Sequence, residues 1–170
     1  EESLAFGSHN PCVITFGRNI LNNDFLDFKA IKKHKITIKK TERGGGITMH
    51  NLGQLVVYPV IILTKLGIGI KDFTYLLESC MIEVLNNWNI TAHRNINNPG
   101  IYVKDHKIGF IGFNVSKGVI THGMCMNINN NLSLYSHFRP CRQKNITITS
   151  LSKIIEQNVK VKVVGEIFQK

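Results

Sequence analysis

A glycine-rich segment that leads into a long apolar run constrains the fold of this chain more than any other feature. The segment runs from Arg43 to His50 and includes three consecutive glycines at positions 44–46. The apolar run Leu55–Leu63 follows shortly after and has the length of a buried strand. Because glycines let a backbone approach another group closely, we interpret the segment as a ligand cradle beside a central strand. A tight turn without a ligand is the alternative.

Neither common phosphate-binding signature fits this segment. It has no GK[ST] at the P-loop spacing, and it leads into a strand where a GxGxxG fingerprint would open a helix. The histidines form no HExxH and no paired spacing with cysteine, which argues against a metal site. No GxSxG elbow of a serine hydrolase is present. Other residues must therefore indicate the ligand.

The rest of the chain consists of short predicted strands interleaved with few helices, which favours an α+β fold over a doubly wound parallel sheet. Besides the apolar run, strands are expected at 12–17, 35–39, 90–93, 100–103, 107–115 and 120–128. The strands on either side of residues 105–106 are expected to form a hairpin. Short helices are expected to begin near Phe25, Leu132 and Leu151, the last capped by Thr149 or Ser150.

One longer helix is expected from Phe73 to Asn86, with Asp72 as its N-cap. Its apolar residues recur three and four positions apart, which predicts one buried face. That face comprises Phe73, Leu76, Leu77, Cys80, Met81, Val84 and Leu85. A cysteine at this position is expected to act as a small buried hydrophobe.

Size and charge narrow the class of protein. The chain has 170 residues, 43% of them hydrophobic, and is expected to form one domain over residues 1–170. No apolar run reaches the roughly 18 residues of a membrane span. The net charge of +10 favours acidic partners through long-range attraction. The charges are not interleaved with aromatic residues, so a specific nucleic-acid reader is not expected.

The cysteine pattern indicates a reducing compartment. Cys12, Cys80, Cys125 and Cys141 include no CxxC pair, so we expect neither a disulfide framework nor a zinc site. Cys141 differs from the others because basic residues surround it in the sequence, and positive charge favours the nucleophilic thiolate. These neighbours are His137, Arg139, Arg142 and Lys144. Cys141 is a candidate reactive thiol, with an inert loop cysteine as the alternative.

Lys107 is the second candidate for chemistry. It precedes the apolar segment 108–112. A lysine in this position either extends to solvent or lies beside a thiol, where it would favour the thiolate and carry its proton. Sequence spacing leaves both possibilities open.

Four sequence blocks, taken in order, resemble the lipoyl(octanoyl) transferases of the biotin/lipoate protein ligase fold group. They are Arg43–His50 with Gly53–Tyr58, then Pro99–Val103 with Lys107-Ile108 and Ile111-Gly112, then His122-Gly123 with Asn127–Asn129, and finally Pro140-Cys141 with Thr149–Leu151. The resemblance covers most of the chain. It implies a single α+β domain of the class II synthetase-like type, with a mixed sheet flanked by helices. It also implies that some family sequence precedes Glu1.

The resemblance implies transfer of an octanoyl group, the lipoate precursor, from acyl carrier protein to a lysine of a lipoyl domain. Cys141 would be the nucleophile that forms an acyl-thioester, and Lys107 would activate it and pass protons. An oxyanion could be held by backbone N–H groups of the glycine-rich segment. The acyl pocket would be lined by Arg43, Gly44, Gly45, Gly46, Ile47, Thr48, Met49, His50, Phe110, Ile111, Gly112, Gly123, Met124 and Cys125.

The same resemblance sets expectations about partners. The donor would be octanoyl-acyl carrier protein, and the acceptors would be lipoyl domains of 2-oxoacid dehydrogenase subunits or the glycine cleavage H protein. No metal or nucleotide cofactor is expected, because the thioester is already activated. No nucleic acid and no membrane are expected as partners. The compartment would be the bacterial cytoplasm, a mitochondrion or a plastid.

The chain departs from the family pattern at several positions, which bear on acyl-chain length and loop geometry. Gly46 replaces a glutamine, Asn51-Leu52 replaces Gly-Pro, Phe110 replaces a small residue, and Arg142 replaces a glycine. Two alternatives stay open. One is an ATP-dependent lipoate or biotin ligase, which would form an adenylate without an essential cysteine. The other is a non-catalytic basic binding module.

Overall fold

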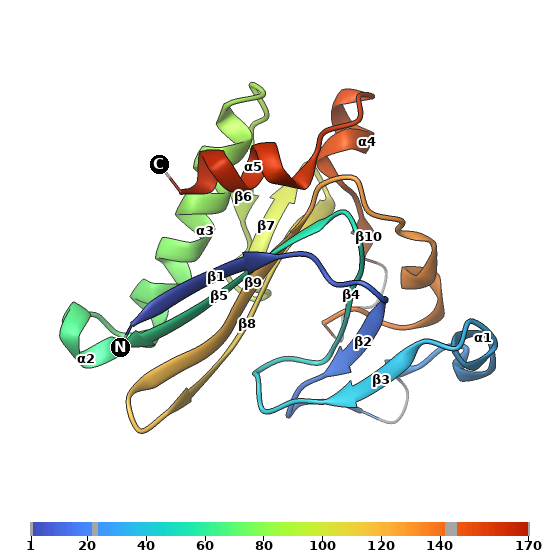
Figure 1. Ribbon diagram of the computed structural model, residues 1–170, viewed down its shortest axis with the longest axis horizontal. Coiled ribbons are helices and arrows are strands. Elements are labelled where there is room, and N and C mark those ends of the chain that lie inside the picture. The colour runs from blue at the N-terminus through green and yellow to red at the C-terminus, as the bar shows by residue number, and fades with distance from the viewer. Residues whose placement is uncertain (1, 22–23, 142–145, 170) are drawn as a thin grey trace.

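The computed structural model describes residues 2–21, 24–141 and 146–169. This part of the chain contains a large mixed sheet, a small three-stranded sheet and helices that lie against the large sheet (Figure 1). The architecture is α+β, as the sequence predicts. None of the described helices is long and apolar enough to cross a membrane.

The large sheet places the apolar run near its centre. In spatial order its strands are β1 (Ser3–Gly7), β5 (Gln54–Ile62), β9 (Val119–Asn127), β8 (His106–Ser116), β7 (Gly100–Val103) and β6 (His93–Arg94), and β10 (Thr147–Ile148) also pairs with β8. The β10–β8 pairing is parallel and the others are antiparallel. In β5, Leu55, Val56 and Val57 are buried, because core clusters lie on both faces of the strand.

Several sequence expectations for this sheet are confirmed, with shifted ends. The predicted hairpin is β7 and β8, joined by a tight turn. The strand expected at 90–93 is reduced to β6. The apolar run ends earlier than expected, because Leu63 begins a short helix, α2 (Leu63–Leu66). The segment expected as a helix near Leu132 is the 3-10 helix η2 (Ser133–His137).

The main hydrophobic core lies between the large sheet and helices α3 (Ile70–Asn86), α4 (Leu151–Ile155) and α5 (Val161–Phe168). Ser150 caps α4 as expected, and its hydroxyl accepts a hydrogen bond from the Lys153 N–H. The sequence pattern did not indicate α5.

Helix α3 is the predicted long helix, but its start was predicted wrongly and its buried face is confirmed only in part. Its N-cap is Gly69, and the carboxylate of Asp72, inside the first turn, accepts a hydrogen bond of 3.0 Å from the Gly69 N–H. Leu76 is 47% exposed and Cys80 is half-buried, so the face that meets the sheet is narrower than the periodicity predicts.

The small sheet lies on the other side of the large one and has the order β3 (Thr37–Lys40), β2 (Val13–Phe16) and β4 (Ile47–His50). A second core cluster fills this side. The helix expected near Phe25 is wrong in position: α1 spans Phe28–Lys33, with Asp27 as its cap. Phe25 instead forms an isolated β-bridge with Phe138, because extended backbone there joins two distant segments. The glycine-rich segment begins in the connection between β3 and β4 and continues through β4.

Candidate active site

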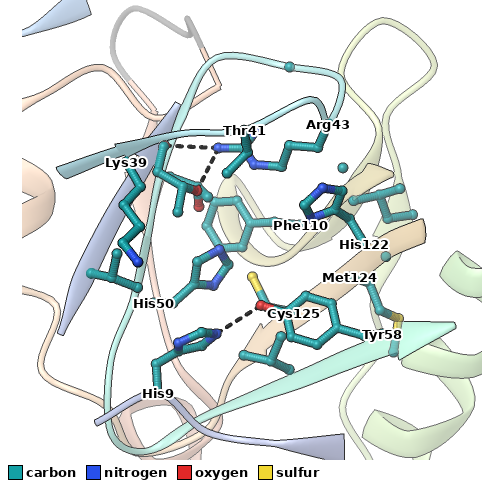
Figure 2. Close-up of a pocket in the computed structure, with 18 of the residues that line it drawn as sticks. His9, Lys39, Thr41, Arg43, His50, Tyr58, Phe110, His122, Met124 and Cys125 are labelled. Carbon is teal, nitrogen blue, oxygen red and sulfur yellow. Dashed lines mark hydrogen bonds between the residues drawn. The ribbon is translucent and has the colours of Figure 1, made fainter. Parts of the chain in front are cut away.

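A cavity of about 390 Å³ lies between the large and small sheets, and residues from both line it (Figure 2). This volume falls within the usual range for small-molecule sites. Eleven predicted site residues line it, namely Arg43, Gly45, Thr48, His50, Phe110, Ile111, Gly112, Gly123, Met124, Cys125 and Cys141. The cavity therefore gathers residues that are up to about one hundred positions apart in the sequence.

Five predicted site residues do not border the cavity as the described residues define it: Gly44, Gly46, Ile47, Met49 and Lys107. The alternation of side chains along β4 explains why Ile47 and Met49 do not border the cavity. Thr48 and His50 face the cavity, whereas Ile47 and Met49 are fully buried in the second core cluster.

The glycine-rich segment is held in place mainly by its carbonyl groups. Gly17 N donates to Gly46 O at 3.1 Å, and Arg18 N donates to Arg43 O at 3.1 Å. A Cβ atom on Gly17 would lie 2.6 Å from both Arg43 O and Gly45 O, so a larger residue would displace the segment. Gly44 N donates to Phe113 O at 3.0 Å and is therefore not available to an oxyanion.

Arg43 extends from the segment across the top of the cavity (Figure 2). Its guanidinium donates to the main-chain oxygen of Thr15 at 2.9 Å, to the Thr15 hydroxyl at 3.0 Å and to Gly44 O at 2.9 Å. The side chain is buried, and Nε has no hydrogen-bond partner among the described residues. Burial lowers the pKa of Arg43, but a guanidinium keeps its charge in a protein. None of the ion pairs between described residues includes Arg43, so its positive charge faces the cavity without a carboxylate.

Cys141 is half-buried on the cavity wall. Its main-chain N–H donates to Ile47 O at 3.0 Å, which ties it to strand β4. Its φ of +54° lies in the left-handed region, which is uncommon for a residue with a side chain and is often found at functional sites. Its thiol lies close enough to Arg43 and Cys125 for electrostatic interaction. The predicted neighbours Arg142 and Lys144 lie outside the described residues.

Lys107 does not extend to solvent. It is 1% exposed, and its Nζ donates to Pro99 O at 2.8 Å and to the Tyr102 hydroxyl at 3.1 Å. Nζ also lies 5.4 Å from the centre of the Phe110 ring. Gly100 makes room for the lysine, because a Cβ there would lie 2.9 Å from Lys107 Cε.

A β-bulge orients Lys107. Ile101 is opposite Gly109, but Tyr102 is opposite Lys107, so Ile108 is an extra residue in β8. Because of this extra residue, side chains before the bulge point to the opposite face of the sheet from the one that regular alternation would give. Lys107 consequently points to the same side as Phe110, which lines the cavity.

Cys125 links the two candidate catalytic residues. Its thiol interacts electrostatically with Lys107, Arg43 and Cys141. Burial raises the pKa of Cys125 to about 12, so it remains a thiol. No hydrogen bond joins Lys107 Nζ to Cys141 in the described part of the chain. Cys125 is thus a common electrostatic neighbour of the two residues.

His50 is a neutral histidine with a defined tautomer. Gln54 donates from Nε2 to Met49 O at 3.2 Å and to Asn127 Oδ1 at 2.9 Å, which directs its Oε1 to His50 Nδ1 at 2.8 Å. His50 Nδ1 is therefore the protonated nitrogen. Burial lowers the pKa of His50 to about 4, despite this hydrogen bond.

Sequence reasoning missed part of the cavity wall. His9 and Tyr58 face the cavity and are joined by a hydrogen bond of 2.8 Å (Figure 2). Alternation along the strand expected at 35–39 could have indicated Thr37 and Lys39, which lie on one side of it and line the cavity. No local pattern indicated His9. The described residues contain no cluster of three or more histidine, cysteine or acidic side chains able to hold a metal ion.

The positions that depart from the family pattern have distinct surroundings. Phe110 lines the cavity and stacks on Tyr135, with ring centres 5.9 Å apart, so it narrows the space that a small residue would leave. Asn51 donates to Asn131 O at 2.8 Å, which supports the turn after β4. Gly46 is buried and binds Gly17 through its carbonyl. Arg142 lies outside the described residues.

A family model and the similar proteins found by sequence comparison indicate the same family. The lipoyl protein ligase A/B catalytic domain model matches residues 1–170. The chain is 36% identical over 157 residues to an octanoyltransferase of Alkaliphilus metalliredigens, covering 91% of this chain and 72% of the relative. It is 37% identical over 117 residues to an octanoyltransferase of Xanthomonas campestris, covering 69% of this chain and 50% of the relative. The chain thus spans about half to three quarters of these relatives.

Solved structures share the fold. A lipoate-protein ligase A bound with ATP superposes with a TM-score of 0.78 at 16% identity, covering 99% of this chain and 70% of the other. A biotin protein ligase from Aquifex aeolicus, in complex with biotin and ATP, gives a TM-score of 0.57 at 16% identity over 69% of this chain and 47% of the other. The fold group expected from the sequence is confirmed.

Proposed function

The chain belongs to the lipoyl protein ligase A/B catalytic domain family, and on that premise we propose that it is an octanoyltransferase that acts through Cys141. The observation that carries the proposal is the arrangement of Cys141 beside the uncompensated charge of Arg43, on the wall of a cavity with apolar lining. Such a cavity fits an aliphatic chain, and the positive charge can stabilise negative charge that develops during acyl transfer. The names of the curated relatives support the same reaction class.

The first step is acylation of Cys141. Its thiolate attacks the carbonyl carbon of an octanoyl thioester, a new C–S bond forms, and the bond to the donor thiol breaks. The departing thiolate takes up one proton. We assign stabilisation of the transient oxyanion to the Arg43 charge. The main-chain N–H groups of Gly44 and Cys141 are already bound to carbonyl oxygens.

The second step transfers the acyl group to an amine. A lysine amine of a lipoyl domain attacks the thioester, a C–N bond forms, and Cys141 leaves as a thiolate. Lys107 is proposed to move the proton in both steps. Its ammonium has three N–H groups, of which two bind Pro99 and Tyr102, so it can offer a proton while keeping its position.

The donor is proposed to be octanoyl-acyl carrier protein, and the acceptors are lipoyl domains of 2-oxoacid dehydrogenase subunits or the glycine cleavage H protein. The +10 charge of the chain supports an acidic donor. The free state of the described cysteines fits a reducing compartment.

The test follows both steps in one reaction. Purified protein is mixed with octanoyl-acyl carrier protein and a lipoyl domain, and the lipoyl domain is analysed by intact mass spectrometry without ATP. Octanoylation of the domain is the expected result. Modification that occurs only with ATP and free acid, with release of pyrophosphate, would instead identify a ligase. Carrier-protein binding without any acyl transfer would identify a non-catalytic module.

A further inference from the structure

Helix α1 and strand β3 carry an unusual concentration of positive charge. Between Phe28 and Thr41 the chain has six lysines and no acidic residue. All six are exposed, and none takes part in an ion pair between described residues. They are Lys29, Lys32, Lys33, Lys35, Lys39 and Lys40. We call this segment the basic surface.

Exposed apolar side chains accompany the charges. Leu26 is 54% exposed and Phe28 is 41% exposed, and both lie next to the lysines of α1. The ammonium of Lys32 lies 4.9 Å from the centre of the Phe28 ring. A surface that combines charge with exposed large hydrophobic residues is typical of protein recognition.

The basic surface is fixed to the segment that bears the candidate nucleophile. Leu26 N donates to His137 O at 3.0 Å, and Arg139 N donates to Asp24 O at 2.7 Å. Ile31 of α1 is fully buried in the second core cluster, which also contacts Cys141. A partner bound to α1 would therefore be held close to the cavity wall that contains Cys141.

Strand β3 connects the basic surface to the cavity. Thr37 and Lys39 of β3, and Thr41 just after it, line the cavity, and Figure 2 labels Lys39 and Thr41 among the lining residues. Lys39 is exposed and also lines the cavity, so its ammonium can meet a charged group that enters from outside.

We propose that the basic surface is the docking site for the acidic carrier protein that delivers the acyl thioester, with Lys39 meeting the phosphate of its prosthetic arm. The proposal rests on the function proposed above. Charge complementarity favours an acidic partner, and the exposed Leu26 and Phe28 favour a protein over a nucleic acid. The connection through β3 would lead the arm from the bound carrier to Cys141.

The test reverses charge on one face of α1. Lys29, Lys32 and Lys33 are three and four positions apart and are replaced together by glutamate, as K29E/K32E/K33E. The matched control is K71E/K153E/K160E, which changes net charge equally at exposed lysines on the helical side of the large sheet. Acylation of the enzyme is measured with octanoyl-acyl carrier protein and with octanoyl-pantetheine, a small thioester without phosphate or protein.

We expect the α1 variant to raise the KM for octanoyl-acyl carrier protein by roughly tenfold or more, with octanoyl-pantetheine unaffected. The control variant should change the KM for either donor by no more than about twofold. Lys39→Ala should weaken use of octanoyl-phosphopantetheine several-fold more than use of octanoyl-pantetheine. An α1 variant with wild-type KM for the carrier protein would overturn the proposal. An α1 variant that is acylated equally poorly by all donors would also overturn it. Loss of RNA or anionic-vesicle binding with an unchanged carrier KM would assign the surface to another partner. If the wild-type protein is acylated by neither donor, the proposed function itself fails.

Discussion

The ammonium of Lys107 is buried and donates a hydrogen bond of 3.1 Å to the hydroxyl of Tyr102, which in turn donates to Asn98 O at 3.1 Å. Tyr102 thus fixes the lysine through a short chain of hydrogen bonds. We predict that Tyr102→Phe lowers kcat about fivefold, because one hydrogen bond of about 1 kcal/mol that orients Lys107 is lost. KM for the donor should stay unchanged. The exposed Tyr75 gives the control, Tyr75→Phe. Wild-type kcat in Tyr102→Phe would show that this contact does not position the lysine.

Lys107→Met tests proton transfer while keeping the length of the side chain. We expect acylation of Cys141 and transfer to the lipoyl domain each to slow by about 10² to 10⁴, the usual contribution of a general acid–base group. Single-turnover kinetics separates the two steps. Lys104→Met, at an exposed position nearby, is the control. If only one step slows, Lys107 does not serve both.

Arg43→Lys tests the hydrogen bonds by which the buried Arg43 guanidinium joins the glycine-rich segment to Thr15. A single ammonium cannot reproduce the planar geometry of the guanidinium and its three hydrogen bonds, and the two Thr15 oxygens that it leaves are buried. We expect the free energy of unfolding to fall by about 2 kcal/mol, measured by urea denaturation. The exposed Arg18 supplies a comparison, Arg18→Lys, that should stay within about 0.5 kcal/mol of wild type.

The pH dependence of stability should depend on His50. The folded state keeps it neutral down to a pKa of about 4, whereas the unfolded chain protonates it near 6.5. Between these values the unfolded state binds more protons, so stability falls as the pH drops from 6.5 towards 4. The loss from this residue is at most roughly 3.5 kcal/mol, at about 1.4 kcal/mol per pKa unit.

The measurement is the free energy of unfolding across this pH range for wild type and His50→Gln. The variant should show a shallower slope. Some dependence should remain, because burial also lowers the pKa of His9 and His122. Identical slopes in both proteins would contradict the assigned state of His50.

The sequence predicted elements best where local patterns and tertiary packing agree. Strand β5 is apolar from Leu55 onward and its first half is buried on both faces, so its pattern is unambiguous. The N-cap of helix α3 was predicted wrongly. Asp72 lies inside the helix, where its carboxylate accepts a hydrogen bond from the N–H of Gly69, the true N-cap. Helix α1 was misplaced because residues near Phe25 are held extended by a bridge to Phe138, a contact that no local pattern encodes.

The candidate site also depends on contacts that local sequence patterns do not encode. The glycine-rich segment and Cys141 could be selected by residue type, but their shared cavity arises from packing between two sheets. The burial of Lys107 depends on a bulge at Ile108 and on the partner Tyr102, which spacing does not reveal. The roles assigned to Lys107 and to the pocket residues stay predictions until the variants are measured.

The proposed mechanism requires a covalent acyl intermediate on Cys141, which intact mass spectrometry can detect after the protein is mixed with octanoyl-acyl carrier protein. Cys141→Ala is compared with Cys12→Ala, since both cysteines line the cavity. We expect that wild type and Cys12→Ala gain the mass of one octanoyl group, which hydroxylamine removes, and that Cys141→Ala gains none. An octanoyl adduct of equal yield on Cys141→Ala would contradict it.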